Sequence, residues 1–170
     1  GSEDFHICVL DLAAGTLRDL AEQYFPALNT NYAWSPDGKG IAVLSIIEHI
    51  YRVSILPLEE GLPRKVIDHQ QPVWDVRWSP SGDRLAIVVE TDGSDSGIFL
   101  IDLKNGQETW LALDKKKLNA KNPAWSPDGC ELAFSSNPAG FFNIGIYRIE
   151  DQKLHWLTSG ETEKTRPAWS

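Results

Sequence analysis

Residue types that often carry chemistry are present in this sequence, but none is arranged in a pattern that defines a reaction. The stretch 93–97, GSDSG, approaches the GxSxG elbow of serine hydrolases, except that Asp95 stands where the nucleophilic serine belongs. The four histidines lie at unrelated positions, and there is no HExxH pair, phosphate-binding loop or dinucleotide fingerprint. The sequence therefore predicts no catalytic residue in this chain and gives no indication of a cofactor.

Carboxylates gather in the stretch 90–97, ETDGSDSG, where Glu90, Asp92 and Asp95 offer the hard oxygen ligands that Ca²⁺ prefers. The stretch lacks the length and the closing glutamate of an EF-hand loop. An Asp-Gly turn between two strands is sufficient to explain it. We therefore expect no metal site here.

The bulk composition is that of an ordinary globular domain. The 170 residues are 42% hydrophobic and 24% charged, which is enough for one domain with a core. A net charge of −8 repels phosphate and anionic lipid, so we expect no nucleic-acid partner and no binding to a membrane surface. The longest apolar runs, such as 41–47, are too short to span a bilayer, so we expect no membrane insertion. The leading Gly-Ser at 1–2 resembles an expression scar, and an export signal upstream of it would have been lost.

Two other features fit structural roles. Cys8 and Cys130 have no metal-binding spacing, so they are either two unpaired thiols, the favoured interpretation, or one long-range disulfide. Four lysines lie in the stretch 114–122, which is too small and too isolated in an acidic chain to indicate nucleic-acid binding. A solvated connection between two sheets explains it.

One motif recurs through the chain at a regular interval. The sequence WSPDG or WSPSG begins at Trp34, Trp78 and Trp125, and the chain ends in PAWS with a fourth tryptophan, Trp169. The intervals between these tryptophans are 44, 47 and 44 residues. A period in the forties is typical of propeller blades, each of which is a four-stranded antiparallel sheet.

The motif has the residues of a tight turn between two strands. Proline presets φ at the first corner and glycine accepts a positive φ, while the serine hydroxyl can accept a bond from a backbone N–H of the turn. In the second copy Ser81 replaces the aspartate. We expect this turn to survive, because Pro80 and Gly82 are kept.

The stretches between these turns predict the other strands. Nearly continuous apolar runs, such as 97–103, are typical of strands buried on both faces, and the last strand of each unit is charged like an outer edge. The predicted fold class is all-β: a propeller fragment of four-stranded antiparallel blades, three full repeats with partial blades at both ends. The expected units are a partial blade at 3–33, blades at 34–77, 78–124 and 125–166, and the start of another at 167–170. We expect the four repeated tryptophans to pack between blades rather than to stack on a ligand.

The repeated WSPDG turn, with segments such as GIFLIDL at 97–103 and WLT at 156–158, resembles the TolB-like β-propeller repeat, a relative of WD-repeat blades. The resemblance covers essentially the whole chain. Such repeats occur in the TolB periplasmic protein and in the gating propellers of prolyl-oligopeptidase-family and tricorn-type peptidases. The resemblance implies the fold, and it does not by itself imply an activity. A complete ring needs more chain, so we expect this to be a piece of a longer propeller, able to self-associate through its open blade edges.

Binding is expected at one rim, where the loops from strand two to three and from strand four to the next blade emerge. These loops contain the least repeat-like residues, and the candidate binding residues are His49, Trp74, Phe141 and Phe142. The two phenylalanines, in NPAGFFN at 137–143, either anchor a protein interface or fold back onto the blade.

Three functions remain open at this point. The first is a non-catalytic scaffold that binds a protein or peptide at the rim, and the second is the gating propeller of a prolyl-oligopeptidase-like serine peptidase whose catalytic domain lies elsewhere. The third is a structural module without a ligand. The compartment is unknown: the resemblance implies the periplasm for a TolB-like protein and the cytoplasm for a peptidase.

Overall fold

The computed structural model describes residues 7–20, 28–59, 61–91, 95–111 and 119–170. Within these ranges the chain is all-β, with one two-stranded hairpin followed by three four-stranded antiparallel sheets. The hairpin is β1 (Cys8–Asp11) and β2 (Thr16–Asp19). The first full sheet is β3 (Leu28–Trp34), β4 (Gly40–Ile47), β5 (Ile50–Pro57) and β6 (Arg64–His69). The second is β7 (Val73–Trp78), β8 (Arg84–Glu90), β9 (Ser96–Asp102) and β10 (Glu108–Trp110). The third is β11 (Lys121–Trp125), β12 (Glu131–Ser136), β13 (Asn143–Arg148) and β14 (Lys153–Trp156).

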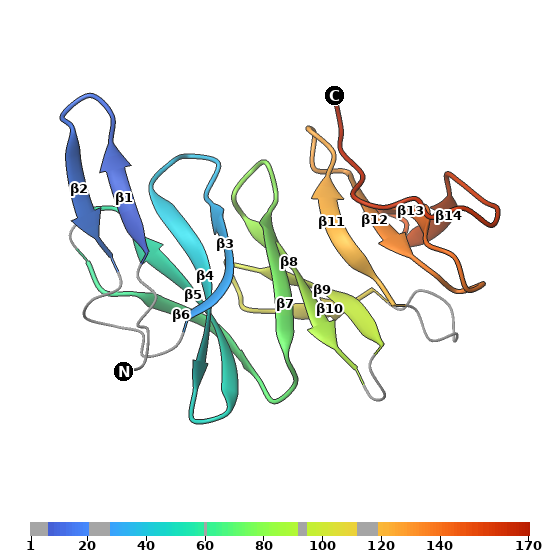
Figure 1. Cartoon of the computed structure of the whole chain (residues 1–170), viewed down its shortest axis with the longest axis horizontal. Helices are drawn as coiled ribbons and strands as arrows, with labels where there is room; N and C mark the ends of the chain where they lie inside the picture. Colours follow the sequence, from blue (N-terminus) through green and yellow to red (C-terminus); the bar gives the residue numbers. More distant parts are fainter. Residues whose placement is uncertain (1–6, 21–27, 60, 92–94, 112–118) are drawn as a thin grey trace.

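The sheets follow one another in chain order, from the hairpin at one end to β11–β14 at the other (Figure 1). In every full sheet, strands that are consecutive in sequence are also neighbours in space. The first strands β3, β7 and β11 lie next to one another and form the inner side of the arc. The arrangement is an arc of propeller blades, as the sequence predicted.

The repeat units counted from the tryptophans are offset from the sheets by one strand. Each tryptophan ends the first strand of its sheet: Trp34 ends β3, Trp78 ends β7 and Trp125 ends β11. At the C-terminal end, residues 167–170 take the same place beside the third full sheet but carry no strand ladder, because no described strand pairs with them.

The Ser-Pro turns close each first hairpin through the serine. In the first turn, Ser35 Oγ accepts from Gly40 N at 2.9 Å and donates to Asp37 Oδ1 at 2.6 Å. The third turn repeats this, with Ser126 Oγ accepting from Glu131 N at 2.9 Å and donating to Asp128 Oδ1 at 2.6 Å. The serine hydroxyls therefore hold the pKa of each turn aspartate below its ordinary value.

The second turn keeps this geometry with a different carboxylate. Ser79 Oγ accepts from Arg84 N at 3.0 Å, as its counterparts do in the other turns. The acceptor is now Asp83, which receives bonds from the hydroxyls of Ser81 and Ser79. The turn survives the loss of its aspartate, as expected, because Asp83 supplies the carboxylate from two positions further on.

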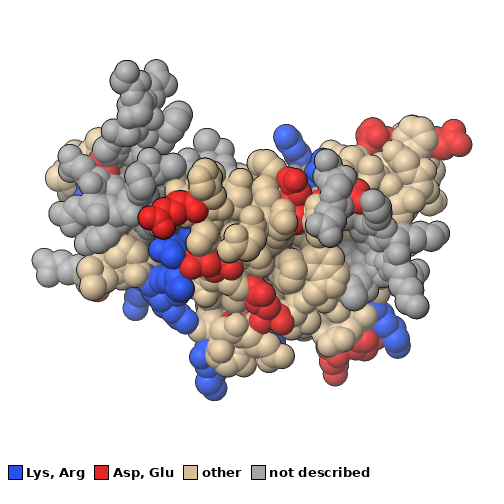
Figure 2. Space-filling model, turned by 90° about the horizontal axis from the view of Figure 1, so that it is seen from below, with Lys and Arg blue, Asp and Glu red and all other residues tan. Residues whose placement is uncertain are grey.

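The outer strands carry the exposed and charged residues of each sheet. All four residues of β2 are exposed, and β14 is exposed at three of its four positions. Figure 2 shows the molecule of Figure 1 from below. On this surface acidic side chains lie across the middle and basic side chains lie mainly toward the edges. Charge on these outer edges discourages pairing with other sheets, as the sequence indicated.

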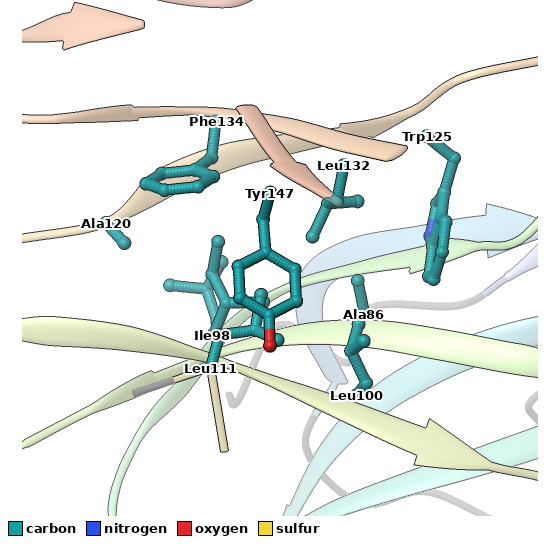
Figure 3. Close-up of a cluster of buried hydrophobic side chains, with 10 residues drawn as sticks. Ala86, Ile98, Leu100, Leu111, Ala120, Trp125, Leu132, Phe134 and Tyr147 are labelled. Atoms are coloured by element: carbon teal, nitrogen blue, oxygen red, sulfur yellow. The ribbon is translucent and has the colours of Figure 1, made fainter. Parts of the chain in front are cut away.

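The core lies between neighbouring sheets, so it is built from both faces of the middle strands. Between the second and third full sheets, Leu132, Phe134 and Tyr147 of the third sheet meet Ile98 and other side chains of the second (Figure 3). A second cluster joins the first and second full sheets through residues such as Val53 and Ile87, both fully buried. Burial on both faces explains the nearly continuous apolar runs.

The repeated tryptophans pack between sheets, with one exception. Trp78 Nε1 donates to the Ala33 carbonyl and Trp169 Nε1 to the Ala124 carbonyl, both at 2.9 Å, and Trp125 is 9% exposed. Trp34 is 49% exposed, so the expectation of packing is wrong for this residue. In the described part of the chain before β3 only the two-stranded hairpin β1–β2 is formed, and no described inner strand covers this tryptophan.

The β4–β5 connection is a two-residue turn in which both residues, neither of them glycine, have a positive φ. Glu48 has φ 51° and His49 has φ 67°, the left-handed region that both central residues of a type I′ hairpin turn require. Asn-Gly is the preferred pair for such turns, so replacing Glu48 and His49 by Asn and Gly should raise the free energy of unfolding by about 1 kcal/mol. Urea denaturation would measure the change. Alanine at both positions is the control, because it keeps a side chain at positive φ, and an equal gain there would contradict the explanation.

Candidate functional site

Each inner strand has an irregular register at its beginning. The pairing of β3 with β4 shifts between Leu28 and Tyr32, and that of β7 with β8 between Val73 and Asp75. The pairing of β11 with β12 shifts between Lys121 and Ala124. Bulges of this kind bend an edge strand and turn its side chains in a new direction. The irregularity recurs at the same place in each sheet, so it belongs to the repeat.

The residue three positions before each tryptophan is polar in all four copies, and in the three inner strands it lies within or at the end of this irregular stretch. These residues are Asn31, Asp75, Asn122 and Arg166. All four line one hollow of about 750 Å³ on the inner side of the arc. The repeat therefore brings a polar group from every copy to a shared space.

Asp75 is the most deeply buried charged group of the hollow. Its side chain is 12% exposed, and burial raises the pKa of its carboxyl, although the Arg77 guanidinium and the Val76 N–H oppose that rise. Arg77 Nη1 lies 3.0 Å from Asp75 Oδ1, and Val76 N donates to the same oxygen at 2.9 Å. The pair places one buried negative and one half-exposed positive group in the lining.

The pKa shifts predict opposite effects of pH on stability at Asp75 and at Asp83. The raised pKa of Asp75 gives a contribution that is complete below its ordinary pKa and is lost as pH rises through the raised value, by up to about 1.4 kcal/mol per pH unit. The lowered pKa of Asp83, held down first by Ser81, gives a contribution present above its ordinary pKa and lost as pH falls. Urea denaturation of Asp75→Asn and Asp83→Asn between pH 3 and 7 should therefore show opposite trends relative to the unsubstituted chain. Parallel trends would contradict these assignments.

Trp74 is the aromatic residue of the hollow. It lies at the start of β7, is 47% exposed, and its Nε1 donates to Glu90 Oε2 at 3.2 Å. Its carbonyl accepts from the Asn31 side chain of the neighbouring sheet. An indole held by its edge with a face open to solvent is suited to contact an apolar or cationic group of a partner.

One of the two candidate phenylalanines borders this region. Lys121, which lines the hollow, has its Nζ 5.0 Å from the ring centroid of Phe142. The Phe142 backbone is fixed to the following segment, since its N donates to Glu163 Oε2 at 3.0 Å and its carbonyl accepts from Lys164 N at 2.8 Å. Phe141 is 40% exposed in the same loop. Phe142 therefore contacts Lys121, a residue that lines the same hollow as Trp74.

His49 does not join this site. It is exposed in the β4–β5 turn and does not line the hollow. Its conformation is explained by the turn itself. Of the four candidates only Trp74 lines the hollow, and Phe142 borders it through its contact with Lys121.

The four polar residues Asn31, Asp75, Asn122 and Arg166, called here the polar ring, were not identified from the sequence, although their regular spacing from the tryptophans is visible there. The third residue before each tryptophan is polar in every copy, but its meaning depends on inner strands meeting around one axis. Of the stretch 90–97, Glu90 and Asp95 line the hollow, while Asp92 lies outside the described residues. In the described ranges, no three His, Cys, Asp or Glu side chains are grouped to hold a metal ion.

Two other sequence expectations concern the cysteines and membranes. Cys8 and Cys130 are both exposed and unpaired, so the disulfide alternative is not realised. Asp128 raises the pKa of the Cys130 thiol, which keeps it in the protonated form.

Across the described part of the chain, no helix has the length and apolar character needed to cross a membrane.

The family model of the TolB beta propeller domain matches residues 2–170. A peptidase of Bacillus subtilis, the uncharacterized YuxL, is 26% identical over 145 residues, covering 64% of this chain and 22% of that protein. The Tol-Pal system protein TolB of Alkalilimnicola ehrlichii is 33% identical over 65 residues, covering 38% of this chain and 15% of that protein. The chain thus spans less than a quarter of either relative.

Solved structures agree with this assignment at the level of fold. A putative TolB from Agrobacterium tumefaciens superposes with a TM-score of 0.75 at 24% identity, over 91% of this chain and 55% of that one. A puromycin-hydrolyzing peptidase from Mycobacterium tuberculosis gives 0.70 at 18% identity, over 92% and 26%. The repeated turns, the stacked four-stranded sheets and the family match agree, and the chain belongs to the TolB beta propeller domain family.

Proposed function

We propose that this propeller unit is a non-catalytic scaffold that binds a protein or peptide segment at the hollow on the inner side of the arc. The observation that carries the proposal is the polar ring. Four copies of one repeat position line a hollow of about 750 Å³, beside a half-exposed tryptophan. A concave site with a few converging polar groups and an aromatic anchor is the usual form of a binding pocket.

The lining favours a peptide over a small uncharged ligand. It contains carboxylates at Asp75 and Glu90 and cationic groups at Arg77, Lys121 and Arg166. A peptide offers side chains of both signs and backbone groups that match the asparagines. Phe141, exposed on its braced loop, extends the surface for a longer segment.

The test is a selection from a phage-displayed library of random dodecapeptides on the immobilised protein. Enriched peptides would be synthesised with a photo-crosslinker. Mass spectrometry would then identify the residues of this chain to which they crosslink. We expect adducts on residues that line the hollow. Enrichment no greater than on a blank surface, or adducts confined to the outer strands, would refute the proposal.

A second function is favoured by the likeness to the Bacillus peptidase and to the puromycin-hydrolyzing peptidase. In that case the unit would belong to a propeller that restricts access to a separate serine peptidase domain. The coding sequence beyond Ser170 distinguishes the two. A strand–GxSxG–helix unit there, followed by Asp and His, would support the peptidase, and its absence would leave the scaffold.

A further inference from the structure

A small pocket lies between the second and third full sheets and shares no lining residue with the hollow. This inter-sheet pocket has a volume of about 210 Å³. Pockets that hold drug-sized ligands have volumes of about 300–1,000 Å³, so this one suits a smaller molecule. The polar residues that line it are Arg84, Asp102, Gln107, Thr109, Tyr147 and Gln152.

Tyr147 is the buried polar residue of the inter-sheet pocket. It is 6% exposed and extends from β13 toward the second sheet, with its hydroxyl at the far end (Figure 3). This hydroxyl has no hydrogen-bond partner among the residues that the structure describes. Burial, and after it the Asp151 carboxylate, raises the pKa of the phenol, so the hydroxyl keeps its proton. Because a buried tyrosine hydroxyl usually has a partner, this one is available to a ligand.

Arg84 supplies a positive charge to the same pocket. It lies directly opposite Asp102 in the β8–β9 ladder, where an ion pair would be expected. Asp102 Oδ1 instead accepts from Lys104 N at 2.8 Å and from Asn105 N at 3.1 Å, within its own turn. Within the described ranges the Arg84 guanidinium has neither an ion pair nor a hydrogen bond. It is therefore free to bind a carboxylate.

Gln107, Thr109 and Gln152 add neutral side chains that can both donate and accept hydrogen bonds. In the part of the chain that is described, none of these three side chains has a hydrogen-bond partner. Gln152 has φ 55°, whereas the equivalent position of the β9–β10 turn is Gly106, with φ 72°. A glutamine in a backbone conformation that suits glycine indicates that its side chain has a use.

We propose that the inter-sheet pocket binds a small hydroxylated carboxylate, of the size of a three-carbon hydroxy acid. The Arg84 guanidinium binds the carboxylate, a pairing that planar guanidinium groups favour. The Tyr147 hydroxyl and the Gln152 amide bond the hydroxyl groups, while Leu100 contacts the carbon chain. A cationic ligand is less well matched, because the Asp102 carboxylate is already engaged by its own turn. The proposal does not depend on binding at the hollow.

The first test is a titration of the unsubstituted chain with glycerate, followed by ¹⁵N–¹H NMR. The side-chain amide signals of Gln107 and Gln152 report directly on the pocket. Glycerate should shift these signals to saturation. Glycerol, in which a CH₂OH group replaces the carboxylate, should bind at least about tenfold more weakly. The absence of a saturable shift of either amide, or an equal response to glycerol, would overturn the proposal.

Two variants test the groups that would hold the ligand. Arg84→Gln should weaken glycerate binding by about tenfold or more, because it removes a charge-assisted contact. Lys39→Gln, at an exposed position of the first turn, removes the same charge elsewhere and should leave binding unchanged. Tyr147→Phe should weaken binding by about fivefold without lowering the urea midpoint, since its hydroxyl has no partner to lose within the described chain. Tyr51→Phe, in the first full sheet, is its control.

Gln152→Gly separates binding from folding. Glycine suits the positive φ at this position, so the urea midpoint should rise, whereas the affinity for glycerate should fall by about threefold. A purely structural residue would not give this split. Unchanged affinity in both Tyr147→Phe and Gln152→Gly would overturn the proposal. A lower urea midpoint for Tyr147→Phe would also overturn it, because the hydroxyl would then have a structural role.

Discussion

Truncating Phe134 to alanine is expected to lower the free energy of unfolding by about 3–5 kcal/mol. Phe134 is 0% exposed and lies in the cluster between the second and third full sheets (Figure 3). A Cβ built on Gly145 would lie only 3.0 Å from the Phe134 ring, so the side chain fills its site closely and truncation leaves a cavity. Urea denaturation followed by circular dichroism measures the change.

Phe141→Ala is the matched control for this measurement. Phe141 is 40% exposed in the β12–β13 loop, so its truncation should change stability by no more than about 0.5 kcal/mol. Comparable losses for the two variants would contradict the conclusion that the main core lies between sheets. A loss below about 1 kcal/mol for Phe134→Ala would do the same.

Replacing Trp74 by alanine should weaken the capture of selected peptides by about 30-fold, which corresponds to about 2 kcal/mol. The indole is held by Glu90 and leaves one face toward the hollow, the position of an interface anchor. Fluorescence anisotropy with a labelled peptide from the selection would measure the dissociation constant. An affinity within about twofold of the unsubstituted chain would remove Trp74 from the binding site.

Trp34→Ala is the matched control, because Trp34 is exposed to a similar extent, 49% against 47%, and does not line the hollow. Trp34→Ala should bind the peptide normally. Trp74→Ala should therefore lose affinity for the peptide, whereas Trp34→Ala should keep it. Loss of peptide binding in both variants would contradict the assignment of Trp74 as the anchor.

The sequence predicted those parts of the fold that depend on local chemistry. The Ser-Pro turns follow from residues such as Pro80 and Gly82, and the strands buried on both faces follow from apolar runs such as 97–103. Trp74 stays a predicted site residue, chosen because it breaks the repeat pattern. Each of these inferences needs only the neighbouring residues and the 44- to 47-residue period.

The remaining features depend on what lies beside each element in space. Trp34 has the same sequence context as Trp78, yet of the two only Trp78 has a described inner strand of the preceding sheet to pack against. The polar ring depends on four inner segments meeting around one axis, and the bulges that turn those residues inward have no local sequence signature. Asp83 could be recognised as the substitute carboxylate only once its distances to the serines were known.

The substitution in the second turn has a consequence for how such units can change over evolutionary time. The turn serine donates to a carboxylate at either of two positions, to Asp37 in one turn and to Asp83 in another. During evolution the aspartate can therefore move by two positions through an intermediate sequence that has an aspartate at both positions. The serine of the turn then always has a carboxylate to donate to. A protein engineer could move the acid of the other two turns by the same route.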